Sequence, residues 1–283
     1  MKLKMKLMAA AVALAASAGA HAATAGSMDN FQSGNSSLAF IALDSVGSPI
    51  SMMMDLDFNL NSFLPAAMSA PGTTIQWNFG ANTLTVNGVL SGSTQTNWSG
   101  ALSSFNALAQ TTETQWGVIA GDSATTRYLT TVVAGTPIGT VDNTTKGNLT
   151  GFAAVDLMVN NQGNAQQLAG TNGSTASSGD GYVGQTYGFG TTASRGWQNK
   201  IATGVDTLAD VGNNADFYMY DTTSPGGGTA PAKASLYAGT FNYAAGVLTY
   251  SVAAVPEPSE YALMLAGLGM IGFMARRRLN HRA

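Results

Sequence analysis

Apolar and polar residues alternate along several short segments of the chain, as they do in β-strands that have one buried face. In residues 75–79 large apolar side chains occupy every second position. Leu84 and Val86 repeat this pattern after the turn-forming residues 80–82, which predicts a β-hairpin. Residues 244–246 join two further segments of this kind and predict a second hairpin. The strands predicted outside the first hairpin are residues 37–46, 115–120, 127–134, 216–220, 235–243 and 247–253.

Two segments have apolar residues at helical spacing instead, residues 103–110 and 148–168. Residues 171–181 and 224–232 are rich in Gly, Ser or Pro, so we expect them to be loops. Short strands separated by Gly and Asn, with one or two short helical insertions, are typical of a mainly β fold. We therefore predict an antiparallel β-sandwich over residues 23–254.

The N-terminus has the features of a Sec signal peptide. Three lysines precede an apolar run at residues 7–18, and Ala20 and Ala22 provide the small residues that signal peptidase recognises. A retained membrane anchor is the alternative, but the run is shorter than the roughly 20 residues of a spanning helix. We therefore expect residues 1–22 to direct export through the Sec machinery and to be removed by signal peptidase.

Three features follow one another at the C-terminus. Pro256, Glu257 and Pro258 predict an extended segment that an enzyme can bind, because each proline disfavours a helix before it. Residues 261–275 are apolar and would form a helix about 22 Å long, against roughly 30 Å for the hydrocarbon core of a bilayer. We expect a single, marginal transmembrane helix. The chain then has a basic cluster, Arg276, Arg277 and Arg278, which favours the cytoplasmic side and places the body across the membrane.

This order of features resembles the PEP-CTERM sorting signal of exported proteins of Gram-negative bacteria. The resemblance covers residues 255–283, about a tenth of the chain. It implies recognition of Pro256, Glu257 and Pro258 by an exosortase, a membrane-embedded processing enzyme that removes the apolar tail after transient anchoring in the inner membrane. It further implies a final location at the cell surface or outside the cell, and an association with exopolysaccharide or biofilm formation.

Charge and composition exclude several functions for the body. Residues 24–254 contain thirteen acidic and five basic residues, a net charge of −8, whereas nucleic-acid binding requires a positive surface. Both histidines, His21 and His281, lie in the terminal segments, and the chain has no cysteine. The body therefore lacks the residues of Ser/His or Cys/His catalysis and of zinc or haem sites. We expect no cofactor and no metal, and a protein that is not an enzyme.

A carbohydrate-binding module is one alternative function, because exposed aromatic rings can stack on sugars. The four tryptophans are Trp77, Trp98, Trp116 and Trp197. Core packing is their usual role, but Trp98 lies among polar residues. We expect Trp98 to be exposed and to be the best candidate for glycan contact.

An Asp-dependent glycan-cleaving enzyme is a further alternative. On a strand Asp55 and Asp57 would share one face about 7 Å apart, close enough for a pair of carboxylates at a glycosidic bond or for calcium. A solvated strand surface is the simpler interpretation. A looser group of oxygen ligands could hold a structural calcium, although a polar loop is favoured there too: Asp206, Asp210, Asn213, Asn214 and Asp216.

Overall fold

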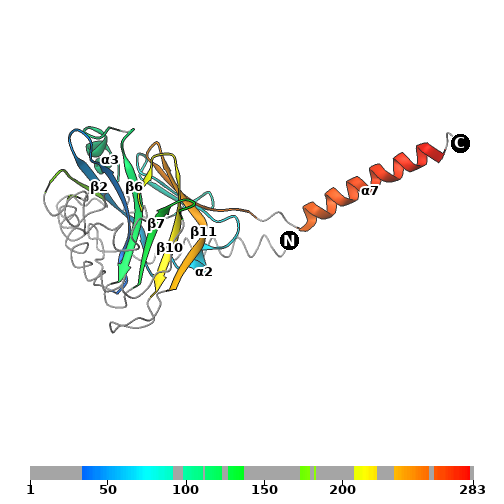
Figure 1. Cartoon of the computed structure of the whole chain (residues 1–283), viewed down its shortest axis with the longest axis horizontal. Helices are drawn as coiled ribbons and strands as arrows, with labels where there is room; N and C mark the ends of the chain where they lie inside the picture. The colour runs from blue at the N-terminus through cyan, green and yellow to red at the C-terminus, as the bar shows by residue number, and fades with distance from the viewer. Residues whose placement is uncertain are drawn as a thin grey trace.

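The computed structural model describes residues 34–91, 98–110, 112–122, 127–136, 173–178, 182, 207–221, 233–254 and 258–280. The predicted signal peptide and the helix predicted at residues 148–168 lie outside these ranges. Figure 1 shows a curved β-sheet and a long C-terminal helix, α7 (Pro258–Asn280), that extends away from it.

Antiparallel strands make up most of the described body. The strands are β1 (Ser37–Asp44), β2 (Ile50–Asn59), β3 (Thr74–Asn78), β4 (Thr83–Val86), β5 (Val89–Leu90), β6 (Gln115–Asp122), β7 (Arg127–Val133), β8 (Gly173–Ala176), β9 (Ala209–Asp210), β10 (Asn214–Asp221), β11 (Lys233–Ala244) and β12 (Val247–Val252). In the described residues they form one sheet in the order β5-β4-β3-β12-β11-β10-β7-β6-β1-β2-β8, with β9 paired to β6. The mainly β, antiparallel fold is thus confirmed.

Both predicted hairpins are present, β3–β4 and β11–β12. In the second, Ala245 and Gly246 have φ values of 50° and 77°, as a two-residue type I′ turn requires. The β3–β12 pairing joins residues far apart in sequence, with Trp77 opposite Leu248. The sheet is therefore not complete until the last strand of the body has been added.

The sheet curls so that its two halves face each other across one core. Phe40 on β1 packs against Tyr243 on β11, with ring centroids 4.7 Å apart. Trp77 Nε1 on β3 donates a hydrogen bond to the carbonyl oxygen of Leu56 on β2 at 2.7 Å. Strands β2 and β3 lie near opposite ends of the hydrogen-bonded order. The sandwich prediction is wrong in one respect: β10 pairs with both β7 and β11, so the two layers are halves of one continuous sheet.

The centre of the core is aromatic. Phe63 lies between β2 and helix α2 (Pro65–Met68), is fully buried, and contacts five other rings. These rings are Phe58, Phe217, Tyr237, Phe241 and Tyr250. The hydroxyl of Tyr237 donates to the carbonyl oxygen of Phe63, and that of Tyr250 to the carbonyl oxygen of Met68 at 2.8 Å. The two tyrosines thereby hold the α2 segment on the sheet.

Helix α3 (Ser99–Asn106) packs on β2 and β8 through Ala101 and Phe105. The helix predicted at residues 103–110 is confirmed in part, since α3 begins earlier and ends at Asn106. Strand β8 lies in a segment predicted to be a loop, where Gly173 to Ala176 pair with β2. That prediction is wrong at these four residues. Their backbone hydrogen-bonds to β2, and the local sequence pattern does not reveal this pairing.

The two halves of the sheet differ on the face turned away from the core. On β1 and β2, Ile41 and Met53 alternate with core residues, yet both are fully buried. On β3 and β12, Gln76 and Ser251 occupy the outward positions and are exposed. One half is thus buried on both faces, while the other presents a polar face to solvent.

Candidate functional site

Helix α7 begins at the last residue of the Pro-Glu-Pro sequence. Pro258 suits the first helical position, because a proline there loses no helical hydrogen bond and its φ is already near the helical value. Pro256 and Glu257 lie outside the described residues. The predicted extended conformation therefore does not include Pro258. A processing enzyme that binds the tripeptide would contact the start of this helix.

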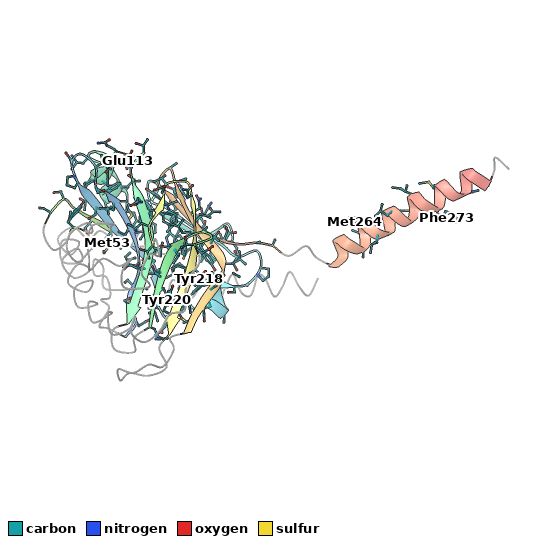
Figure 2. The ribbon with its side chains drawn as sticks, viewed as in Figure 1. Met53, Glu113, Tyr218, Tyr220, Met264 and Phe273 are labelled. Atoms are coloured by element: carbon teal, nitrogen blue, oxygen red, sulfur yellow. The ribbon has the colours of Figure 1, made fainter. Side chains whose placement is uncertain are left out.

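The apolar side chains of α7 are exposed instead of packed on the sheet. Those of Leu263 and Phe273, near the two ends of the apolar segment, are 73% and 69% exposed. Figure 2 shows Met264 and Phe273 on the helix, well away from the body. The other exposed members of this surface are Leu265, Leu268, Met270, Ile271 and Met274. An exposed apolar surface of this extent is typical of a segment that meets lipid or an apolar protein surface.

Charges lie at the two ends of α7. Glu260 belongs to the first turn of the helix, and Arg277, which is exposed, belongs to its last turn. The side chains of Arg276 and Arg278 lie outside the description. The predicted basic cluster thus follows the apolar segment directly on the same helix.

Among the described residues, no helix combines the length and the apolar character that crossing a membrane requires. Helix α7 has 23 residues and is about 35 Å long. Its apolar part, residues 261–275, accounts for only about 22 Å of that length. The predicted transmembrane helix is therefore not confirmed: the helix forms, but its ends are charged.

The predicted signal-peptidase residues, Ala20 and Ala22, lie outside the described residues. Their role stays a prediction.

Trp98 is not an exposed aromatic residue, and this prediction is wrong. Its side chain is fully buried, and Nε1 donates to the carbonyl oxygen of Asp55 at 2.7 Å. The ring packs edge-on against Phe79, with centroids 5.5 Å apart. The polar neighbours suggested exposure, but Trp98 immediately precedes α3 and is carried into the core by it. Trp77 and Trp116 are also fully buried, and Trp197 lies outside the described residues.

Asp55 and Asp57 do not form a regular pair on one strand. Asp55 is buried, and its Oδ2 accepts a hydrogen bond from Ser37 Oγ at 3.1 Å. Its Oδ1 accepts one from the backbone N–H of Asp57 at 2.9 Å. Asp57 has a φ of 59°, where the register between β1 and β2 shifts. Asp55 thus stabilises a left-handed residue in an irregular part of β2, which is a structural role for its carboxylate.

The predicted calcium cluster is divided among separate contacts. Asp216 Oδ2 accepts a hydrogen bond from the backbone N–H of Gly135 at 3.1 Å. Asn214 Oδ1 accepts one from Asn242 Nδ2 at 2.9 Å. Asp206 lies outside the described residues. In the described part of the chain, no three His, Cys, Asp or Glu side chains gather in a group that could hold a metal ion.

Asp44 is a structural carboxylate that sequence reasoning missed. It is fully buried at the end of β1, and its two oxygens accept hydrogen bonds from the backbone N–H groups of Val46, at 2.8 Å, and Gln110. Asp44 therefore joins the β1–β2 turn to the chain after α3. Burial, together with the charge of Asp44, raises the pKa of Tyr182. An Asp three residues before a turn glycine, Gly47, was the available signal for this cap.

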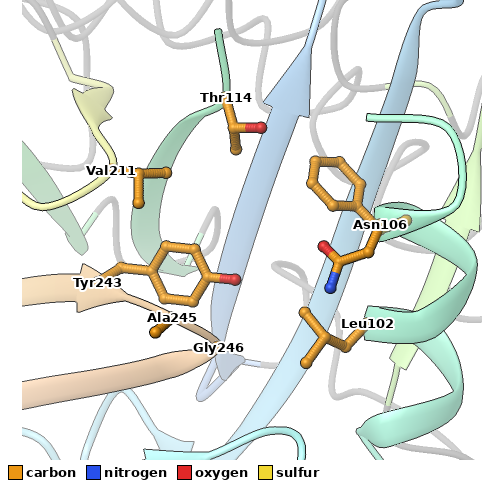
Figure 3. Close-up of a pocket in the computed structure, with 8 residues that line it drawn as sticks. Leu102, Asn106, Thr114, Val211, Tyr243, Ala245 and Gly246 are labelled. Atoms are coloured by element: carbon orange, nitrogen blue, oxygen red, sulfur yellow. The ribbon is translucent and has the colours of Figure 1, made fainter. Parts of the chain in front are cut away.

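A small cavity of about 210 Å³ lies at the end of the sheet nearest α3 (Figure 3). Leu102, Phe105 and Val211 contribute apolar surface, and Asn106 and Tyr243 contribute polar groups. Burial raises the pKa of Tyr243 to about 12, so its hydroxyl is protonated at neutral pH. Among the described residues, no carboxylate lines this cavity.

The comparisons with known proteins concern the C-terminal element. The family model of the PEP-CTERM protein-sorting motif matches residues 254–278. The match confirms the resemblance noted from sequence, and it ends within the basic cluster. No curated protein and no solved structure matches the chain.

Proposed function

We propose that this PEP-CTERM protein is exported, processed at its Pro-Glu-Pro sequence, and delivered to the cell surface or extracellular matrix as a component without enzymatic activity. The observation that carries the proposal is the match of the sorting-motif model to residues 254–278. That match implies exosortase-dependent sorting of an exported protein that is transiently anchored at the membrane. Exopolysaccharide or biofilm formation is the setting that we propose for the mature body.

The geometry of α7 supports a role as a temporary membrane anchor that is separate from the body. Its apolar surface is free to meet lipid, and its arginines lie at the end farther from the body. Because the apolar segment is short, membrane attachment through it is weak, which suits an anchor that is later removed. Pro256 and Glu257 lie between the last strand of the sheet and this helix, where a processing enzyme would bind them.

The described body supports a binding or structural role over catalysis. Asp44 and Asp55 are buried and accept hydrogen bonds from the protein's own donors. The region from 24 to 254 contains no histidine or cysteine. A hydrolytic mechanism would therefore depend on carboxylates that are partly committed to structure.

The test is a pair of glutamate variants expressed in cells that have the processing enzyme. Glu257→Ala alters the tripeptide, whereas Glu260→Ala, three residues later, removes the same charge from the first turn of α7. We expect Glu257→Ala to accumulate in the inner membrane with its tail intact, and Glu260→Ala to be processed like the wild type. Cell fractionation and the intact mass of the mature protein measure both outcomes. Normal processing of Glu257→Ala, or a mature wild-type protein that keeps its arginine cluster, would contradict the sorting role.

A further inference from the structure

The outward face of β4, β3, β12 and β11 carries a row of neutral polar side chains. Thr85, Gln76, Thr249 and Asn242 lie directly opposite one another on the four successive strands. Neighbouring strands are about 4.8 Å apart, so the row extends about 14 Å across the sheet. Each of its members can both donate and accept hydrogen bonds.

Further polar side chains lie on both sides of this row. Thr74, Ser251 and Thr240 are aligned two residues away along the strands. On the other side Thr83 and Asn78 are aligned, and that row continues into the apolar residues Val247 and Ala244. Side chains two positions apart on a strand are about 6.8 Å apart. The nine polar residues of these rows form a lattice of hydroxyl and carboxamide groups, which we call the polar face.

The polar face lacks charge and aromatic rings. None of its residues is ionisable, although the body as a whole is strongly acidic. The aromatic residues of the same strands, among them Trp77 and Tyr250, point into the core and are fully buried. Asp216 on β10 and Leu90 on β5 border the face, opposite Thr240 and Thr85. Within these borders the face offers no aromatic ring on which a sugar could stack, and hydrogen bonding is its main interaction.

Several members of the face have hydrogen-bonding groups available. Asn78 and Asn242 are partly engaged: the Asn78 carboxamide oxygen accepts from the backbone N–H of Ala81, and the Asn242 amide donates to Gly212 and Asn214. Gln76 and Ser251 are exposed, and no hydrogen bond joins their side chains to other residues in the described part of the chain.

We propose that the polar face binds a neutral polysaccharide, which deepens the proposed function and rests on it for the location of the body. The hydroxyl groups of a neutral sugar chain are donors and acceptors at short, regular intervals and carry no charge, so they complement this lattice. An acidic polysaccharide would find no cation here. A second copy of this chain fits less well, because stable dimers bury an apolar centre, whereas Leu236 and Leu90, the exposed large apolar residues described next to the face, lie at its borders.

The experiment measures binding of the purified full-length chain, kept in mild detergent, to three neutral polysaccharides, namely microcrystalline cellulose, chitin and starch, with alginate as the acidic comparison. The test variant is Gln76→Val combined with Thr249→Val, since valine suits a strand but cannot hydrogen-bond. Thr112→Val changes an exposed threonine in the turn before β6 and is the matched control. Circular dichroism establishes that each variant is folded.

We expect binding to at least one neutral polysaccharide that changes little with salt concentration, no binding to alginate, about tenfold weaker binding by the double variant, and no change in the control. Absence of binding to all three neutral polysaccharides, equal binding by the double variant, or binding to alginate alone would overturn the proposal. Self-association that the double variant abolishes would identify a second copy as the partner instead. The Glu257→Ala variant should bind like the wild type. A negative binding result would therefore leave the sorting role intact, and normal processing of Glu257→Ala would leave the binding proposal intact.

Discussion

The sheet and α7 use similar apolar side chains in opposite ways. In the sheet Phe63 is fully buried among five aromatic rings, whereas Phe273 in α7 is 69% exposed. Burial of an aromatic side chain contributes several kcal/mol to folding, while an exposed one contributes almost nothing. The apolar residues of the body therefore stabilise the fold, and those of α7 remain available to a partner outside the chain.

The largest expected effect is on the core itself. Phe63→Ala should lower the free energy of unfolding by about 3–5 kcal/mol, because it leaves a cavity among five rings. The same substitution in α7, Phe273→Ala, should change it by less than about 0.5 kcal/mol. Urea unfolding followed by tryptophan fluorescence measures both. Similar losses in the two variants would mean that α7 packs on the body in solution.

A second prediction concerns the hydroxyl groups buried within the body. The pKa of Tyr243 is raised from about 10 to about 12 by burial. Between these values the unfolded chain loses the phenolic proton while the folded protein keeps it, so stability falls as the pH rises through this window. Tyr243 should contribute about 1.4 kcal/mol of this loss per pH unit. Below about pH 9 it should make no pH-dependent contribution to stability.

The variant Tyr243→Phe isolates that contribution. It should reduce the slope of unfolding free energy against pH between pH 10 and 12 by about the same 1.4 kcal/mol per unit. Tyr220, Tyr237 and Tyr250 have pKa values raised further by burial, and they should maintain a residual slope. An unchanged slope in the variant would show that Tyr243 is accessible to solvent.

The smallest expected effect on stability comes from α7. Leu265→Ser combined with Leu268→Ser should leave the urea midpoint of the body unchanged, because both side chains are exposed. The same variant should move from the detergent phase toward the aqueous phase in detergent partitioning, since its apolar surface is smaller. A shifted urea midpoint with unchanged partitioning would reverse the roles assigned to the two regions.

The sequence predicted most of the longer strands, namely β1, β6, β7 and β10 as well as the strands that follow simple alternation. Strands β3, β4, β11 and β12 have one polar face, so their pattern was readable. Strand β2 was not predicted, because Met52, Met53 and Met54 are all buried and the alternation disappears. When both faces of a strand are covered, the sequence no longer shows by periodicity which side chains point into the core.

The site was predicted unevenly for a related reason. The order of Pro-Glu-Pro, apolar segment and arginines is local in sequence, and the family model matches it. The environment of Trp98 is set by residues such as Asp55, more than forty positions away, so its neighbours in sequence were misleading. The conformation of Asp57 depends on a register shift between strands, which no local pattern reports.

The pairing of β3 with β12 sets an order of events for an exported chain. One edge of β3 remains unpaired until nearly all of the body has crossed the membrane, because its partner on that edge is β12, the last strand before the tail. Strand β12 ends at Val252, so at most about 14 Å of chain separates the finished sheet from Pro256. Completion of the fold thus draws the cleavage region close to a rigid body. If a processing enzyme at the membrane acts there as proposed, it can cleave the folded substrate only if its active site accommodates the body, and folding and processing would then compete in time.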